Sequence, residues 1–188
     1  FMSWDHPLVR GALDLLLGAE FGNAAFGIRK GSGAEAILLE IHAVVECVAP
    51  APLHADRFLP ATPVRVLVDH TTADRTEEEG LLSPELEKGD VFRLLDRGAV
   101  KKKLLPAMLA KAQELANERM RKIVEGAHTT MESQVQDEIE RLEDLSAVND
   151  HIRPAEIAAA RQEKADLAAA ISSARLRLDA LRLIFCVT

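Results

Sequence analysis

Nucleotide chemistry is the first chemistry that the residue types suggest, because a glycine-rich stretch, Gly31-Ser32-Gly33, occurs early in the chain. A dinucleotide-binding loop must follow a strand and open a helix, so that phosphate can approach the backbone amides. Here the glycines lead into residues 37–48, whose apolar residues alternate as in a strand. The stretch therefore predicts a turn between two strands. The sequence also lacks the Gly-x-x-x-x-Gly-Lys-Ser/Thr phosphate loop, which excludes nucleotide hydrolysis through that motif.

Metal and nucleophile chemistry have no better support in the sequence. The six histidines show no ligand spacing, and no two of them lie three or four residues apart as on a zinc-binding helix. Cys47 and Cys186 lie in apolar runs, where a thiol is usually a small buried hydrophobe. No serine or cysteine has a recognisable nucleophile setting. We therefore predict no catalytic, no cofactor-binding and no metal-binding residue in this chain.

The charged residues are unevenly distributed along the chain. The net charge of −7 argues against a surface devoted to nucleic acid. Residues 101–125 nevertheless hold seven basic against three acidic residues, whereas residues 126–150 hold seven acidic residues against Arg141. Two interpretations stay open, a solvated helix face or two surfaces that meet different partners. The candidate partner-contact residues are Lys101, Lys102, Lys103, Arg119, Arg121 and Lys122.

The first half of the chain predicts a helix followed by a small sheet. The helix begins near Ser3-Trp4-Asp5 and ends at Gly22-Asn23. Beyond it the apolar period changes to two, which is typical of strands. In the longest alternating run Glu40 and His42 share a partly wet face, which indicates an antiparallel sheet. The predicted strands are residues 24–30, 37–48 and 64–69.

The second half predicts a long helical hairpin. Apolar residues recur in steps of three and four through residues 104–148 and 155–181, and the short link between them favours an antiparallel pair. The long helix either continues through Gly126 or breaks there, because a glycine and two nearby β-branched residues lower helix propensity. Residues 183–187 are β-prone and predict a strand that returns to the sheet.

The predicted fold class is thus α+β, a small antiparallel sheet with an N-terminal helix followed by a long helical hairpin. A polar, acidic stretch marks an internal boundary between residues 1–72 and 73–188, which we expect to form one structural unit. The chain contains no run of 18 apolar residues, and its first residues do not resemble a signal peptide. We therefore expect a cytoplasmic protein with no membrane partner.

Three stretches resemble the C-terminal region of a known family. They are residues 3–10 (SWDHPLVR), 57–65 (RFLPATPVR) and 177–184 (RLDALRLI), which follow each other in the family's order. The family is RapA, also called HepA, which comprises bacterial RNA polymerase-associated, ATP-dependent, helicase-like proteins of the Swi/Snf type. Because the stretches fall near the start, middle and end, the resemblance extends over nearly the whole chain.

The resemblance implies a non-catalytic C-terminal domain of a larger ATPase. Such a parent protein binds RNA polymerase, hydrolyses ATP with magnesium on separate lobes, acts on DNA or RNA, and promotes polymerase recycling during transcription. The motor motifs are absent from this sequence, so we expect no enzyme activity and no cofactor in the fragment itself. The implied partners are the remainder of the parent ATPase and RNA polymerase. The alternative is a free-standing coiled-coil adaptor that homodimerises, although Lys164 in the apolar stripe disfavours a tight parallel dimer.

Overall fold

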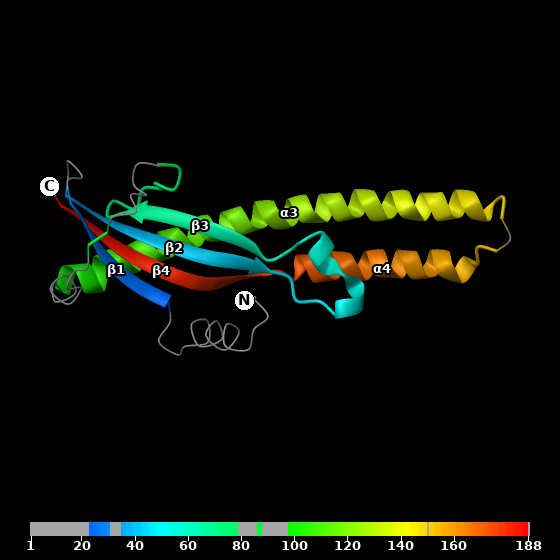
Figure 1. The fold of residues 1–188 in the computed structure, drawn as a ribbon, viewed down its shortest axis with the longest axis horizontal. Coiled ribbons are helices and arrows are strands. Elements are labelled where there is room, and N and C mark those ends of the chain that lie inside the picture. Colours follow the sequence, from blue (N-terminus) through cyan, green and yellow to red (C-terminus); the bar gives the residue numbers. More distant parts are fainter. Residues whose placement is uncertain (1–22, 31–34, 79–85, 88–97, 150, 188) are drawn as a thin grey trace, which may run out of the picture. The chain divides into compact units, whose positions relative to one another are not determined.

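The computed structural model describes residues 23–30, 35–78, 86–87, 98–149 and 151–187 (Figure 1). Within these ranges, four strands form one sheet. Two α-helices come between the third and the fourth strand in the chain. The strands are β1 (Asn23–Lys30), β2 (Ala36–Glu46), β3 (Thr62–Asp69) and β4 (Arg175–Val187). The helical elements are η1 (Ala51–Leu53), η2 (Ala55–Arg57), η4 (Val100–Leu104), α3 (Leu105–Ser146) and α4 (Pro154–Ser172). The fold class is α+β, as predicted, while the predicted N-terminal helix and the glycine turn lie outside the described residues.

The sheet is mixed, so the predicted antiparallel sheet is wrong. Its strand order is β1-β4-β2-β3, and β1 pairs with β4 in parallel, from Asn23 opposite Ala180 to Lys30 opposite Val187. The arrows in Figure 1 show β2 running opposite to both β4 and β3. The prediction rested on the partly wet face of residues 37–48, which is typical of antiparallel sheets but does not exclude a mixed one. It returned a C-terminal strand to the sheet but gave no position for it, and β4 lies between β1 and β2.

Strand β4 also replaces the end of a predicted helix. The apolar spacing predicted a helix over residues 155–181, but α4 ends at Ser172 and β4 begins at Arg175. Incorporation into the sheet outweighs a local helical spacing, because strand preference depends strongly on tertiary context. The second arm of the hairpin is therefore shorter than predicted. The strand predicted for residues 183–187 is present and begins earlier.

Helix α3 continues through Gly126 without a break. The hydroxyls of Thr129 and Thr130 donate to the carbonyls of Glu125 and Gly126, each at 2.9 Å, so both β-branched residues are accommodated in the helix. A Cβ atom added at Gly126 would meet nothing within 4 Å apart from its chain neighbours and the nearby backbone of its own helix. The residues that lower helix propensity are therefore tolerated in a helix stabilised by packing elsewhere.

Helix α4 lies alongside α3 and runs in the opposite direction (Figure 1). Arg161 donates to Glu143 at 2.7 Å, and Lys164 donates to Gln136 at 3.1 Å, so α4 contacts α3 at two levels. Pro154 occupies the first turn of α4, as predicted. The buried apolar residues on the two helices include Met131, Val135, Ile139, Leu167 and Ile171. No helix in the described ranges is long and apolar enough to span a bilayer.

The chain divides into two compact units, each assembled from separate segments. Unit 1 contains Phe1–His42, Arg65–Ala112 and Leu178–Thr188, and unit 2 contains Ala43–Val64 and Gln113–Arg177. A core cluster of unit 1 consists of Leu38, Leu67, Ile184 and Cys186, against which Ala36 and Leu86 pack. The buried residues of unit 2 include Val45, Leu59, Val64, Met131, Leu167 and Ile171. The boundary between residues 72 and 73 stays a prediction.

The described part of the polar stretch after β3, which predicted the internal boundary, is folded back onto that strand. The backbone N–H of Arg75 donates to the carbonyl of Leu67 at 2.8 Å. Asp69 accepts hydrogen bonds from the hydroxyl of Thr71 at 2.6 Å, from the amide of Ala73 at 3.0 Å and from the guanidinium of Arg75 at 2.8 Å. Burial alone would raise the pKa of Asp69, but these hydrogen bonds lower it to about 2.

Candidate functional site

The segment between β2 and β3 is fastened to α4 at two places in unit 2. The thiol of Cys47 donates to the carbonyl of Ala170 at 3.4 Å, and Arg57 donates to Glu163 at 3.2 Å. The guanidinium of Arg57 also lies 4.6 Å from the ring centroid of Phe58, a cation–π contact that orients it. The residues of this segment that are buried are Ala55 and Leu59. Its prolines exclude a regular strand or α-helix, so these side chains must hold it in place.

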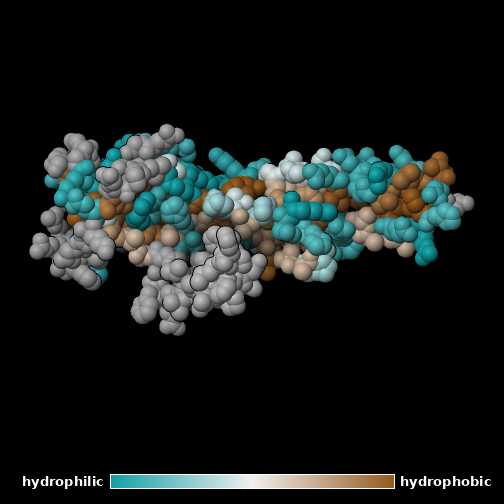
Figure 2. All heavy atoms as spheres, in the orientation of Figure 1, coloured by the Kyte–Doolittle hydropathy of each residue, from teal (hydrophilic) through white to brown (hydrophobic). Residues whose placement is uncertain are grey.

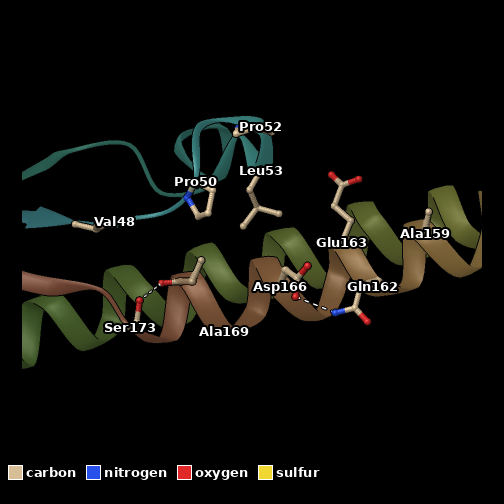
Figure 3. Close-up of a pocket in the computed structure, with 11 residues that line it drawn as sticks. Val48, Pro50, Pro52, Leu53, Ala159, Gln162, Glu163, Asp166, Ala169 and Ser173 are labelled. Carbon is tan, nitrogen blue, oxygen red and sulfur yellow. Dashed lines mark hydrogen bonds between the residues drawn. The ribbon is translucent and has the colours of Figure 1, made fainter.

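An open groove lies between this segment and α4, and we call it the α4 groove (Figure 3). Its cavity volume is about 740 Å³. Val48, Pro50 and Pro52 line it on the side of the segment, and Leu53 extends from η1 toward α4 in Figure 3. Val48 is 67% exposed, which is unusual for a valine next to a sheet. The remaining lining residues, from α4 and its C-cap, are Ala159, Gln162, Glu163, Asp166, Ala169, Ala170 and Ser173.

The charged residues that line the α4 groove are acidic. Glu163 and Asp166 are its charged lining residues, and none of the lining residues is basic. Glu163 is paired with Arg57, whereas Asp166 accepts a hydrogen bond from the amide of Gln162 at 2.9 Å. Burial raises the pKa of the nearby Cys47 thiol, which keeps it protonated and weakly nucleophilic at neutral pH. In the part of the chain that the structure describes, no group of three His, Cys, Asp or Glu is placed to hold a metal.

A charge cluster in unit 1 was not anticipated from the sequence. The carboxylate of Glu40, which is only 1% exposed, accepts hydrogen bonds from Arg65 at 2.6 Å and from Arg182 at 2.7 Å. His42, two residues along β2, places its Nε2 3.5 Å from the same carboxylate. Burial would raise the pKa of Glu40, but the two guanidinium groups outweigh it and hold that pKa below its ordinary value. Sequence alternation placed Glu40 on a wet face and gave no signal that two other strands supply arginines.

Exposed apolar side chains also occur at the end of the helical pair in unit 2. Leu145 and Val148 are 40% and 83% exposed, near the link between α3 and α4. Figure 2 shows a hydrophobic area at this end of the helices, bordered by hydrophilic residues. Single exposed apolar residues are common on soluble proteins, so these residues alone identify no site.

Comparison with known proteins identifies the family. A family profile described as "RNA polymerase recycling family C-terminal" matches residues 1–186. The chain is 34% identical to the RNA polymerase-associated protein RapA of Pectobacterium atrosepticum, and 35% identical to those of Sodalis glossinidius and Photobacterium profundum. The chain belongs to the RNA polymerase recycling family. Each match covers 98% of this chain but 19% of the relative, so the chain spans about a fifth of the length of these RapA proteins.

The stretches that resemble RapA contain several of the interacting residues described above. Residues 57–65 include Arg57, which donates a hydrogen bond to Glu163 of α4, and Arg65 of the charge cluster. Residues 177–184 lie in β4 and include Arg182 of that cluster. Residues 3–10 lie outside the described part of the chain. Two of the three RapA-like stretches therefore supply side chains to contacts within unit 1 or within unit 2.

The six predicted partner-contact residues of this RapA-like chain fall into two groups. Lys101, Lys102 and Lys103 are exposed in η4, a π-helical turn in unit 1, and such turns are often found at functional sites. Arg121 and Lys122 are exposed on the part of α3 that belongs to unit 2. The sixth residue, Arg119, is half-buried in the same part of α3. No contact in the structure tests whether these residues meet a partner, and that role stays a prediction.

Proposed function

We propose that this chain is the non-catalytic C-terminal domain of a RapA-like, RNA polymerase-associated, ATP-dependent helicase-like protein. The observation that carries the proposal is the family match over residues 1–186, together with relatives whose names state association with RNA polymerase. The domain contributes to RNA polymerase recycling during transcription by contacting the remainder of its parent ATPase, RNA polymerase, or both. A protein with these partners works in the cytoplasm.

ATP and magnesium belong, in this proposal, to the parent and not to this chain. The sequence has no phosphate-binding glycine loop, so we expect this chain to bind neither ATP nor magnesium. DNA or RNA is reached through the parent, because the chain itself has a net charge of −7. The lysines of η4 add at most weak, salt-sensitive binding to nucleic acid.

The test combines polymerase binding with ATP turnover. The 188-residue chain is immobilised and bacterial core RNA polymerase is passed over it, while ATP hydrolysis is followed separately with magnesium present. We expect saturable polymerase binding in the micromolar range, about −8 kcal/mol, and no ATP turnover above background. ATP hydrolysis that a substitution in this chain abolishes would refute the non-catalytic assignment. Absence of polymerase binding would leave contact with the parent ATPase as its remaining role.

The alternative of a homodimerising coiled-coil adaptor is disfavoured by burial within one chain. Leu167 and Ile171, in the apolar stripe of α4, are fully buried without a second copy. A coiled-coil dimer needs such a stripe to be free for its partner. Sedimentation equilibrium should therefore give a monomer, and a dimer whose formation depends on this stripe would favour the adaptor.

A further inference from the structure

We propose that the α4 groove binds a segment of a partner protein that combines apolar with basic side chains. This goes beyond the family assignment, which concerns the whole chain and names no surface. The groove lies entirely within unit 2, so its geometry depends only on the segment between β2 and β3 and on α4.

The groove is held open by its own attachments. The hydrogen bond from Cys47 to Ala170 fastens one end of the segment to α4, and the ion pair from Arg57 to Glu163 fastens it further along. Buried Leu59 anchors the segment beyond that point. The prolines between these attachments have restricted backbones and cannot easily collapse into the space. A preformed recess lowers the conformational cost of binding, because little ordering remains to be done.

The apolar wall of the groove favours apolar side chains in its ligand. Val48 is 67% exposed, and it stands beside Pro50 and Pro52 on the same wall (Figure 3). The opposite wall includes Ala159 and Ala169, whose small side chains leave room for those of a partner. Ligand sites typically combine such apolar lining with a few placed polar groups that fix orientation.

The charges of the groove select a basic partner. Asp166 and Glu163 line it without any basic lining residue, and Glu163 is already partly neutralised by Arg57. A lysine or arginine of the incoming segment can therefore pair with Asp166. The same carboxylates repel the phosphates of a nucleic acid or of an anionic membrane. Apolar contact and charge together point to a protein segment and not to a polyanion.

The test uses two synthetic peptides on the intact 188-residue chain. One fluorescent peptide repeats leucine and lysine, and the other repeats leucine and glutamate with the same apolar spacing. Fluorescence anisotropy measures their binding to the parent chain, to Val48→Asp and to Asp166→Lys. Two matched controls repeat the same changes outside the groove in unit 2, Val148→Asp and Asp137→Lys, both at exposed positions. Circular dichroism confirms that all variants stay folded.

We expect the leucine–lysine peptide to bind, and each groove variant to weaken it at least about tenfold, which corresponds to about 1.4 kcal/mol. The controls should change the affinity by less than about threefold. The proposal is overturned if the acidic peptide binds as tightly, if neither peptide binds at about 1 mM, or if the controls weaken binding as much as the groove variants. The last result would mean diffuse attraction to an acidic protein.

A second copy of the chain is the remaining occupant that the test must distinguish. Sedimentation of the parent chain across concentrations shows whether it self-associates. Dimerisation that Val48→Asp abolishes and Val148→Asp preserves would assign the groove to self-association and overturn the proposal. Because none of these measurements uses RNA polymerase, their failure is separate from failure of the proposed function.

Discussion

Removal of the Glu40 carboxylate should destabilise unit 1 more than removal of any exposed ion pair. In the folded chain Glu40 is 1% exposed and accepts from Arg65 and Arg182, whose side chains are 25% and 37% exposed. Glu40→Ala would remove the carboxylate that both guanidinium groups share, while Arg65 would keep its hydrogen bond to the carbonyl of Thr76. Water can reach part of each arginine, so the cost is lower than for a completely buried charge.

The expected magnitude follows from this partial burial. Removing one partner of a buried ion pair costs about 3–5 kcal/mol, because the remaining charge stays desolvated. Water access to the two arginines places Glu40→Ala near the lower end, at about 3 kcal/mol. That is a large part of the roughly 5–15 kcal/mol by which domains are stable. The exposed pair Lys30–Glu87, at 2.7 Å, is the control, and Glu87→Ala should cost less than about 1 kcal/mol.

Urea denaturation followed by circular dichroism measures both changes. A triple variant, Glu40→Leu with Arg65→Met and Arg182→Met, separates charge from packing. It should be more stable than Glu40→Leu alone, because it leaves no uncompensated charge. The reasoning fails if Glu40→Ala unfolds within about 0.5 kcal/mol of the parent, or if the triple variant is the least stable of the set.

Three further predictions concern single residues. The pKa of Asp69 is lowered to about 2 in the folded chain. Its ionised carboxylate therefore adds about 2 kcal/mol to the free energy of unfolding, a contribution that is complete above pH 4 and is lost as the pH falls toward 2. The urea midpoint of the parent should therefore fall in this window more steeply than that of Asp69→Asn. Gly126→Ala should stabilise the chain by about 1 kcal/mol in urea, because the site is helical and open; a loss of stability would contradict this. Ile171→Asp should cost at least about 3 kcal/mol, whereas Lys164→Leu should stay within about 1 kcal/mol, and equal thermal melting of the two would refute the packed helical pair.

Elements with a strong local period were predictable from the sequence. The alternation through residues 37–48 identified β2 because one face of that strand, including Ile41 and Val45, is buried. The three- and four-residue spacing identified α3 for the same reason, since Met131 and Ile139 recur on its buried side. A local apolar period is sufficient to predict a helix or strand wherever one side of that element faces a core.

Features made by residues distant in the sequence were not predictable. The N-terminal part of β4 has a helical apolar spacing, and only its place in the sheet makes it a strand. The alternating run from Arg175 to Leu178 was a signal for a strand, but it competed with a longer helical pattern. The burial of Glu40 depends on arginines from two other strands, and the α4 groove depends on how a proline-rich segment crosses α4. Neither the burial of Glu40 nor the α4 groove produces a periodic pattern of apolar residues in the sequence.

The position of β4 in the sheet has a consequence for synthesis on the ribosome. Asn23 of β1 pairs opposite Ala180, which is translated 157 residues later. At about 5–20 residues per second, β1 waits roughly 8–30 s for its partner. During that time β1 and the facing side of β2 are unpaired strand edges, which readily pair with other chains. Nascent chains of this family member should therefore depend on chaperones or ribosome shielding until β4 emerges, whereas the α3–α4 pair can form beforehand.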